Sequence, residues 1–345
     1  MSAVAAGAQP KVWIVLVNWN GWRDTVECLE SVLRQDYPAF GVIVCDNASA
    51  DGSLDQLAQW AEGRLSLAPP DGPLRRLSAP PRDKPVPYLR LAAPAQFDPA
   101  ALDCPLLLVQ TGANLGFAGG NNVGIRMALQ DPACGLVWLL NNDTVVEPDC
   151  LSRMVATAGS DAAIGITGSV NCFYADPDRV QAVGGGYFSR RRVKTGLYGF
   201  RLRYDGLPPA LVAQAGRALD WVSGASMLVS RAFLEQVGEM EEQYFLYFEE
   251  IDWALRGEGR FRNALAADAR LYHKSGSSTG EQDDSAFAVY TQYRSRFKLY
   301  RKFMPGWLLA CHLRTVRDAL VAMLRRRRVA ARAMFRAGRD DLFRL

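Results

Sequence analysis

The chain has 345 residues, 49% of them hydrophobic and 22% charged, with a net charge of +4. This composition is ordinary for a globular protein with a substantial core in one large or two moderate domains. No stretch reaches the roughly 18 apolar residues that span a bilayer, and residues 1–10 lack the features of a signal peptide. The seven cysteines form no CxxC pair, which argues against a zinc knuckle and predicts reduced thiols in a cytoplasmic protein.

Strands and helices alternate in the first part of the chain. Short apolar runs rich in β-branched residues predict buried strands, and apolar spacings of three or four predict helices. The predicted strands cover residues 12–17, 40–45, 106–110, 136–140 and 164–170, and the predicted helices cover residues 24–34, 54–60, 122–129 and 148–156. This order predicts a mainly parallel sheet with right-handed crossovers. Ligands of such sheets bind outside the carboxyl ends of the strands.

Two segments interrupt the alternation. Residues 62–105 are rich in proline, and we interpret them as a largely irregular insertion rather than a linker between domains, because the alternation resumes afterwards. Residues 171–218 are rich in Gly, Arg and Tyr, which predicts a long loop system near the site. Beyond them we expect a strand over residues 221–230 and helices over residues 231–237 and 247–256.

Polar side chains follow three of the predicted strands. Asn18 follows the first strand, Asp46 the second and Asp143 the fourth. The Asp46 carboxylate can accept hydrogen bonds from a nucleobase or from ribose hydroxyls, and a helix cap among turn residues is the structural alternative. Asp143 can hold Mg²⁺ or Mn²⁺ against a diphosphate, and a solvated turn is its alternative.

A glycine-rich segment, NLGFAGGNN, covers residues 114–122. Glycines permit close approach of the backbone, and the start of a helix favours an anion. We therefore expect Asn114 and the turn after it to lie near a diphosphate. The segment has neither the GxGxxG fingerprint nor the lysine of a Walker loop, which argues against those two kinds of nucleotide site.

Acidic and aromatic residues are mixed over residues 245–256. Glu249 and Glu250 lie in apolar surroundings, where a carboxyl has a raised pKa and suits proton abstraction, so Glu250 is our candidate for a catalytic base. Asp252 and Arg256 are four residues apart, which favours a structural ion pair.

His273, one of two histidines, precedes a Gly/Ser-rich segment. It is a candidate metal ligand, and a satisfied core or surface histidine is the alternative.

The positive charge is concentrated near the C-terminal end. Residues 294–345 hold 15 Lys and Arg against 3 Asp and Glu, which leaves −8 on the remainder. Apolar residues recur at helical spacing in this part: Leu309, Leu313, Val316, Leu320 and Leu324. Such a basic amphipathic helix suits an anionic membrane surface, with packing on the main domain or a dimer contact as alternatives. The acidic remainder and the lack of aromatic–basic interleaving argue against nucleic acid.

Together these motifs resemble family 2 glycosyltransferases, and more narrowly the bacterial rhamnosyltransferase-like branch that acts on cell-surface glycans. The matching segments are VNWNG (17–21), CDNASADGS (45–53), NLGFAGGNN (114–122), LLNNDT (139–144), GASMLV (224–229), YFEEIDWALR (247–256) and HKSGSS (273–278). The resemblance implies an α/β fold of the GT-A type, a mixed, mainly parallel sheet flanked by helices. We expect this domain over residues 11–280, with the insertion at 62–105 and a basic helical extension over residues 281–345.

The resemblance also implies roles for the nucleotide-binding residues. Asp46 matches the acid that contacts the nucleobase in this family. Asn18 lies where the family contacts the nucleotide, and Asn142 where it approaches the ribose.

Metal and base residues are implied in the same way. Asp143 matches the last position of the family's DxD-like motif, and His273 matches the histidine that completes the metal site. Glu250 matches the second member of the paired-acid motif, the general base. The chain departs from the family at Asn141, the first DxD position, and in having Glu-Glu as the acid pair, which leaves Glu249 as a second candidate for the base.

The function implied by the resemblance is metal-assisted, inverting transfer of a sugar from a nucleotide-sugar to a hydroxyl of a glycan or lipid-linked acceptor, in cell-surface polysaccharide synthesis. By resemblance alone, the sugar is L-rhamnose from dTDP-rhamnose and the metal Mg²⁺ or Mn²⁺. We expect a cytoplasmic protein, peripheral on the inner face of the cell membrane. The alternatives are a non-catalytic nucleotide-sugar-binding module of the same fold and a nicotinamide-dependent oxidoreductase.

Overall fold

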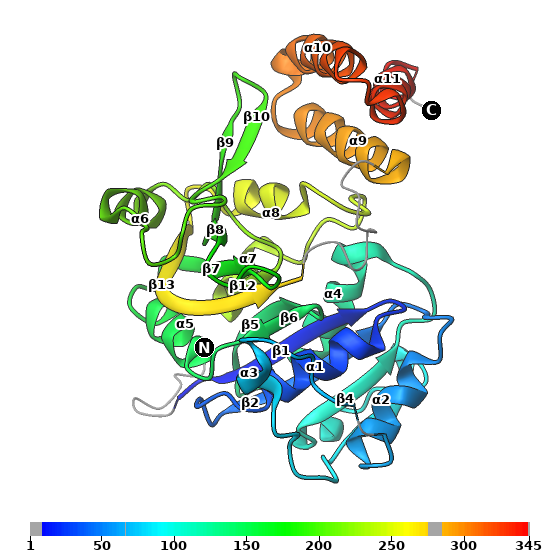
Figure 1. The fold of residues 1–345 in the computed structure, drawn as a ribbon, viewed down its shortest axis with the longest axis vertical. Coiled ribbons are helices and arrows are strands. Elements are labelled where there is room, and N and C mark those ends of the chain that lie inside the picture. Colours follow the sequence, from blue (N-terminus) through cyan, green and yellow to red (C-terminus); the bar gives the residue numbers. More distant parts are fainter. Residues whose placement is uncertain (1–8, 66, 275–284, 344–345) are drawn as a thin grey trace.

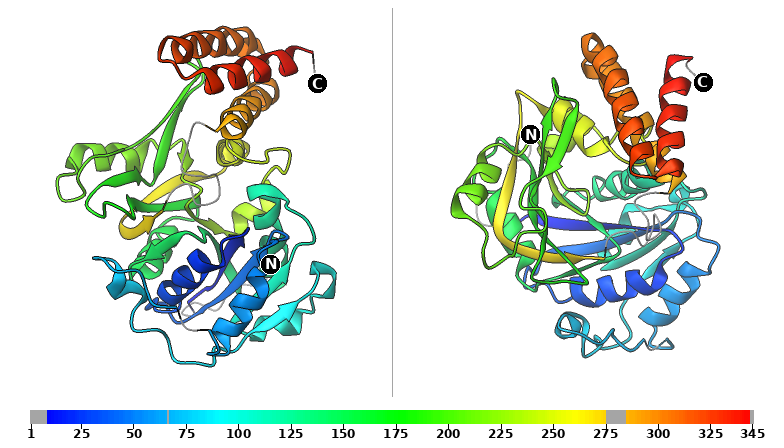
Figure 2. Two further views of the ribbon diagram at one scale, coloured as in Figure 1. Left: turned by 45° about the vertical axis from the view of Figure 1, so that its right-hand side comes forward. Right: turned by 45° about the horizontal axis from the view of Figure 1, so that its top comes forward.

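The computed structural model describes residues 9–65, 67–274 and 285–343. In this part of the chain a large mixed sheet carries helices on both faces, with a small second sheet and a helical arm beside it (Figures 1 and 2). The strands are β1 (Lys11–Asn18), β2 (Phe40–Asp46), β3 (Leu89–Leu91), β4 (Leu106–Gln110), β5 (Cys134–Asn141), β6 (Thr144–Val146), β7 (Ile164–Phe173), β8 (Val180–Val183), β9 (Gly185–Ser189), β10 (Lys194–Leu197), β11 (Trp221–Val222), β12 (Ser226–Ser230) and β13 (Arg262–His273). The helices are α1 (Trp22–Val32), α2 (Ser53–Ala61), α3 (Arg75–Ser78), α4 (Gly116–Ala128), α5 (Cys150–Ala158), α6 (Pro209–Arg217), α7 (Arg231–Val237), α8 (Glu249–Gly257), α9 (Ala286–Phe303), α10 (Leu308–Leu324) and α11 (Arg328–Leu342).

The large sheet has the strand order β3-β4-β2-β1-β5-β12-β7-β13-β6, with β8 paired to β7. The neighbouring strands β3, β4, β2, β1 and β5 are all parallel, as the strand–helix alternation predicts. The strand β12 runs antiparallel to both β5 and β7. The prediction of a mixed, mainly parallel sheet flanked by helices is therefore confirmed.

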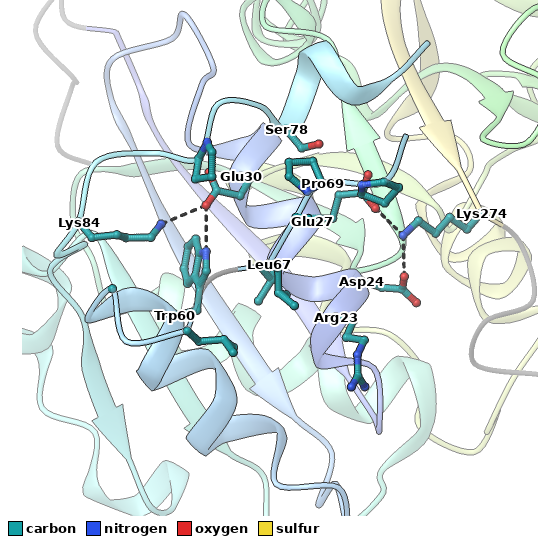
Figure 3. A pocket seen from close by; sticks show the side chains of 16 residues that line it. Arg23, Asp24, Glu27, Glu30, Trp60, Leu67, Pro69, Ser78, Lys84 and Lys274 are labelled. Carbon is teal, nitrogen blue, oxygen red and sulfur yellow. Dashed lines mark hydrogen bonds and ion pairs between the residues drawn. The ribbon is translucent and has the colours of Figure 1, made fainter. Parts of the chain in front are cut away.

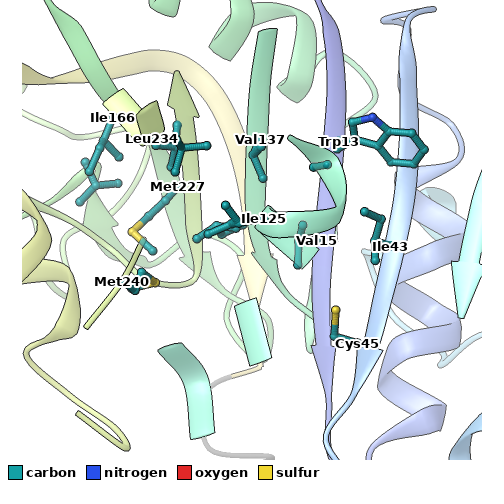
Figure 4. Packing of buried hydrophobic residues seen from close by; sticks show 14 of the residues in the cluster. Trp13, Val15, Ile43, Cys45, Ile125, Val137, Ile166, Met227, Leu234 and Met240 are labelled. Atoms are coloured by element: carbon teal, nitrogen blue, oxygen red, sulfur yellow. The ribbon is translucent and has the colours of Figure 1, made fainter. Parts of the chain in front are cut away.

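The core lies on both faces of this sheet because the central strands are buried on both sides. Along β1, Trp13 and Val15 face the layer that contains α4, whereas Ile14 and Leu16 face the layer that contains α1 and α2. Figure 4 shows the first of these layers, where Trp13 and Val15 lie near Ile43 and Ile125. Continuous apolar runs are the sequence pattern that such doubly covered strands require.

The glycine-rich segment is helical over most of its length, whereas the expected helix begins only at residue 122. The helix α4 begins at Gly116, which has a φ of +70°. Gly120 and Gly124 lie against β1, and an added Cβ would meet the side chains of Val17 and Val15. These glycines therefore serve close packing of the helix on the sheet.

Residues 171–218 were expected to form loops, and this expectation is wrong. They contain the end of β7, the strands β8, β9 and β10, and α6. The strands β9, β10 and β11 form an antiparallel sheet of their own. The expected strand over residues 221–230 is divided into β11 and β12 around Ser223–Ala225. Residues 62–105 are mostly irregular, as expected, and contribute only short elements such as the edge strand β3.

The helices α9, α10 and α11 form a C-terminal arm beside the main domain (Figure 2). Phe297 and Tyr300 of α9 share an apolar cluster with Ile251 of α8 and with Tyr244 and Phe248, which precede that helix. This cluster attaches the arm to the main domain. Within the described ranges, no helix is both long and apolar enough to cross a membrane. All seven cysteines are free thiols.

Candidate active site

The carboxyl ends of four parallel strands bring the predicted polar residues to one edge of the sheet. Asn18 at the end of β1 is in register with Asp46 at the end of β2, and Asp46 with Gln110 at the end of β4. On the other side of β1, Val17 is in register with Asn141 of β5. This register brings the polar residues that end the strands together at one edge of the sheet, as expected for parallel strands.

Asp46 is the centre of a buried hydrogen-bond network. Its side chain accepts hydrogen bonds from Asn18 Nδ2 at 2.6 Å, from Ser49 Oγ at 2.5 Å, from Ser49 N at 3.1 Å and from Gln110 Nε2 at 3.1 Å. Four donors fill the acceptor capacity of a carboxylate. A nucleobase that bound Asp46 would therefore replace one of them. Ser49 and Gln110 are both partly buried, but Ser49 donates two hydrogen bonds to Asp46 and Gln110 only one, so Gln110 is the easier to displace.

Asn142 extends the network toward α1. Its Nδ2 donates to Thr25 Oγ1 at 2.9 Å, and Thr25 Oγ1 donates to Asn18 Oδ1 at 2.8 Å. Asn18 and Asn142 are both buried, so in this arrangement they hold the strand ends together. Asn114, by contrast, is exposed just before α4, where its Oδ1 accepts a hydrogen bond from Gly116 N at 3.1 Å.

Asp143 and His273 meet at this edge although they are far apart in the sequence. Asp143 Oδ1 lies 3.1 Å from His273 Nε2. The pairing of β13 with β6, with His273 opposite Thr144, positions the imidazole beside the turn that carries Asp143. On the other side of the ring, His273 Nδ1 lies 2.9 Å from Gln181 Oε1. A hydrogen bond from Nδ1–H to Gln181 leaves Nε2 as an electron-pair donor toward Asp143, the arrangement of a metal-ligating histidine.

This pair fits a divalent cation that takes further ligands from a substrate. Within the described ranges, no group of three or more His, Cys, Asp and Glu could hold a metal ion by itself. One carboxylate and one imidazole leave several coordination positions for phosphate oxygens and water, as is usual for Mg²⁺ and accessible to Mn²⁺. The residues present therefore fit a metal that binds together with a diphosphate.

Lys274 anchors the strand that carries His273. Its ammonium lies 2.6 Å from Asp24 Oδ1 and 2.5 Å from Glu27 Oε2 of α1, next to a pocket against that helix (Figure 3). Burial opposes the charge on Lys274, but the two carboxylates outweigh it and raise the pKa. Lys274 N also donates to Asp143 O at 3.0 Å, so the ion pairs position both members of the candidate metal pair. The remaining residues of the HKSGSS motif, 275–278, lie outside the described residues.

Glu249 and Glu250 begin α8 and have different surroundings. Glu249 is 3% exposed, and its Oε2 has no hydrogen-bond partner among the described residues. Burial and then the neighbouring Glu250 raise its pKa well above the usual range. Glu250 is partly exposed and lies against Gly224, and burial raises its pKa to about 7.

Glu250 lies at the same sheet edge as the candidate metal pair. It contacts Gly224, and the next residue, Ala225, accepts a hydrogen bond from Asn141 N at 3.1 Å. Asn141 in turn lies two residues before Asp143, and its Nδ2 is 3.2 Å from His273 Nε2. The junction of β5 with β12 therefore connects the carboxylate of Glu250 to the Asp143–His273 pair.

Asp252 has the structural role that its spacing predicts. It is fully buried, and its Oδ1 accepts a hydrogen bond from Arg256 Nε at 2.8 Å. Lys302 Nζ of α9 lies 2.7 Å from Asp252 Oδ2, and Tyr244 donates to the same oxygen at 3.1 Å. This network fixes α8, and with it Glu250, against the arm.

Two models of protein families match the chain. Residues 13–72 match the model of Glycosyl transferase family 2, and residues 103–307 match the model of Glycosyltransferase like family 2. The second match covers more than half of the 345 residues. The chain belongs to glycosyltransferase family 2. Its second match continues past residue 280 and through α9, and the residues between the two matches, 73–102, belong to the proline-rich segment.

Two curated relatives of this family 2 chain are transferases. The low-salt glycan biosynthesis hexosyltransferase Agl10 of Haloferax volcanii is 26% identical over 193 residues, which are 55% of this chain and 58% of that protein. The N-acetylglucosaminyl-diphospho-decaprenol L-rhamnosyltransferase of Mycobacterium tuberculosis is 30% identical over 105 residues, 30% of this chain and 34% of that protein. The matches therefore span little more than half of the first relative and about a third of the second.

Solved structures share the fold at low sequence identity. The mannosyltransferase PcManGT of Pyrobaculum calidifontis, solved with GDP-Man and Mn²⁺, has a TM-score of 0.54 and 14% identity, covering 97% of this chain and 88% of that one. GalNAc-T7, solved with UDP, GalNAc and Mn²⁺, has a TM-score of 0.54 and 11% identity, covering 84% of this chain and 48% of that one. These likenesses confirm the predicted GT-A fold of this family 2 chain.

Several residues of the candidate site were not predicted from the sequence. Gln110 could have been found, because it ends a predicted strand beside Asp46. Thr25 lies on a helix face and Gln181 in a segment expected to be loop, so neither carried a signal. The contact between Gly224 and Glu250 joins residues 26 positions apart and depends on the tertiary fold.

Proposed function

We propose that this chain is an inverting glycosyltransferase that transfers a sugar from a nucleotide-sugar to an acceptor hydroxyl with the help of a divalent metal. The observation that carries the proposal is the meeting of Asp143, His273 and Glu250 at one edge of the sheet. A metal site without a base would serve binding alone, and a base without a metal site would leave the charge of a departing diphosphate unbalanced.

Asp143 and His273 are the proposed metal ligands. Bound there with a donor, Mg²⁺ or Mn²⁺ would neutralise the negative charge that develops on the leaving diphosphate. Gln181 orients the imidazole of His273, and Lys274 holds the end of β13 against α1. These contacts keep the two ligands in place before the donor arrives, which lowers the cost of organising the site.

Glu250 is the proposed base, with Glu249 as its buried neighbour. A carboxyl whose pKa is raised to about 7 is a stronger proton acceptor than an ordinary glutamate and is still largely ionised above neutral pH. Glu250 takes the proton from the acceptor hydroxyl, and the oxygen attacks the anomeric carbon on the face opposite the diphosphate. A single displacement of this kind inverts the configuration at that carbon. The burial of Glu249 makes it the less suitable of the two.

The nucleotide end of the donor is proposed to lie along the β1, β2 and β4 edge. Asp46 would accept a hydrogen bond from the nucleobase in place of Gln110, while Asn18 and Asn142 hold the strand ends that approach the nucleoside. Asn114, exposed before α4, is the proposed contact on the diphosphate side. The buried positions of Asn18 and Asn142 favour positioning over direct contact.

The finer identity of donor and acceptor is proposed from the relatives. The Mycobacterium tuberculosis relative is named for an L-rhamnosyl donor and a lipid-linked acceptor, and the Haloferax volcanii relative for glycan biosynthesis. We therefore propose a glycan or lipid-linked acceptor in cell-surface polysaccharide synthesis, with dTDP-rhamnose as the first donor to test. A lipid-linked acceptor lies in a membrane, and we propose that the reaction takes place at the inner face of the cell membrane.

Thermal unfolding with a panel of nucleotide-sugars tests this function. We expect the cognate donor to raise the Tm when Mn²⁺ is present and much less without it, because the diphosphate supplies metal ligands. At a donor concentration 100 times the Kd, the stabilisation is about 2.7 kcal/mol. NAD and NADP serve as controls and are expected to leave the Tm unchanged. Stabilisation by these dinucleotides but by no nucleotide-sugar would contradict the proposal.

Substituting Gly224 by alanine tests the position of the base. An added Cβ would lie 2.6 Å from Glu250 Oε1, so the carboxylate must move while the backbone of β12 stays in place. A displacement of about 1 Å at a reacting group lowers the rate on the order of 100-fold, so we expect a loss of kcat of that size with little change in Tm. Gly216→Ala is the matched control, because its Cβ would meet nothing within 4 Å. If Gly224→Ala and Gly216→Ala had equal kcat values, Glu250 would not be the base.

A further inference from the structure

The helix α10 presents its large apolar side chains to solvent and its small ones to the protein. Cys311, Thr315, Ala319 and Ala322 are the buried residues of this helix. The exposed residues form a stripe at helical spacing, with the exposed fractions Leu309 71%, Leu313 64%, Val316 45%, Leu320 50% and Leu324 84%. A helix of a soluble domain normally has the opposite arrangement, with the large apolar residues inside.

The stripe continues around the corner between α10 and α11. Met323 and Val329 are 52% and 57% exposed on either side of that corner. No described part of the chain covers these side chains. A contiguous apolar surface of this kind marks a contact with a partner or a membrane.

Four arginines, Arg325–Arg328, form the corner itself and are all exposed. In the part of the chain that the structure describes, Arg325, Arg326 and Arg328 have no ion pair with an acid. Arg317 and Arg332 add two more exposed positive charges from α10 and α11. The apolar stripe therefore ends in a concentrated positive charge.

We propose that the exposed stripe of α10 and the arginine corner bind the surface of an anionic membrane. Apolar side chains that enter the acyl boundary, with arginines at the depth of the phosphates, are the pattern of an interfacial helix. A second copy of this chain is the weaker candidate for the same surface, because the described part of the arm presents no exposed acid that could pair with the arginine corner of the other copy.

The attachment of the arm links this surface to the proposed site. Phe297 and Tyr300 of α9 pack against Phe248 and Ile251, the residues on either side of the Glu249–Glu250 pair. Lys302 of α9 also pairs with Asp252 of α8. A membrane-bound arm would thus be connected directly to the helix that begins with the proposed base. Binding of the arm to a membrane does not depend on the proposed function. Only its purpose, access to a lipid-linked acceptor, rests on that function.

Co-sedimentation of the full chain with lipid vesicles tests the proposal. Phosphatidylglycerol–phosphatidylcholine vesicles are expected to pellet the protein, and more weakly at high salt. Replacing Arg325, Arg326 and Arg328 by Gln is expected to weaken partitioning on the order of 100-fold, at about fivefold per arginine. The triple variant L313Q, L320Q and L324Q is expected to weaken it at least about tenfold. These side chains are exposed, so both variants should keep the Tm of the native chain.

The control variants remove three arginine charges, or two exposed leucines, from elsewhere on the protein. The triple variant R64Q, R82Q and R90Q and the double variant L89Q and L202Q alter exposed residues of the main domain. Native partitioning of these controls, together with weakened partitioning of the arm variants, would support the proposal. No pelleting by anionic vesicles, or equal pelleting of arm variants and controls, would overturn it. A dimer that the leucine variant dissociates, without vesicle binding, would assign the surface to a second copy and also overturn it. The assay contains neither donor nor acceptor, so its failure is distinguishable from failure of the proposed transfer reaction.

Discussion

Replacing Glu250 by Gln is expected to lower kcat on the order of 10²- to 10⁴-fold, the usual contribution of a general base. Gln cannot act as a base, so the proton transfer is lost. Because Gln has nearly the same shape as Glu, the Kd of the donor should remain unchanged. Single-turnover transfer and donor binding, measured on the same preparation, separate the two effects. Glu258→Gln, at the exposed end of α8, is the matched control and should behave as the native chain.

The pH dependence of the native chain provides a second measurement of the same residue. Because burial raises the pKa of Glu250 to about 7, kcat/KM should fall as the pH decreases below about 7, where the base is protonated. The stability effect has the opposite sign. A folded-state pKa above the unfolded value means that stability is lost as the pH rises from about 4.5 to 7. Glu250→Gln should therefore be at least as stable as the native chain above pH 7.

Glu249→Gln distinguishes the two acids. We expect it to retain much more activity than Glu250→Gln, because the Glu249 carboxyl is buried and therefore poorly accessible to an acceptor in solution. The reverse order of activity would identify Glu249 as the base and would move the acceptor to the other side of the start of α8.

Replacing Asp143 by Asn is expected to give the second large effect. Asn keeps an oxygen but removes the negative charge, which leaves His273 as the one proposed protein ligand with a normal affinity for the metal. Loss of several kcal/mol of charge stabilisation corresponds to a decrease of kcat/KM of at least about 100-fold. Titration of activity with Mn²⁺ should show a higher concentration for half-maximal activity.

Asp268→Asn is the matched control for this prediction. Asp268 lies on the same strand as His273, and its side chain is 84% exposed. It should keep the native dependence on Mn²⁺. If Asp143→Asn also kept that dependence, the metal would not bind at the Asp143–His273 pair.

The central strands could be predicted because they are buried on both faces. The runs that became β1, β2, β4 and β5 are continuously apolar, and their order with the intervening helices is enough to predict a parallel sheet. The strands β8 to β10 were missed because glycine and arginine interrupt the period-two pattern and because their pairing is antiparallel and local. The start of α4 was missed because glycines usually end helices, whereas here they allow the helix to pack closely on β1.

The candidate site was predictable where its residues end strands and unpredictable where they meet across the fold. Asp46 and Asp143 follow apolar runs and could be recognised for that reason. The link between Glu250 and the β5–β12 junction depends on the broken strand at Gly224, which the sequence presents as one continuous strand. The exposure of the α10 stripe could not be deduced either, because an amphipathic pattern predicts equally a helix packed on the protein and one packed on a membrane.

The most direct test of the proposed active site is a crystal structure of the Glu250→Gln variant with Mn²⁺ and its nucleotide-sugar. We predict an anomalous peak for Mn²⁺ in contact with Asp143 and His273, and an intact donor whose diphosphate binds the same metal. Residue 250 should lie on the side of the anomeric carbon that is opposite the diphosphate. A nucleotide-sugar bound elsewhere, or a Mn²⁺ peak away from Asp143 and His273, would contradict the account.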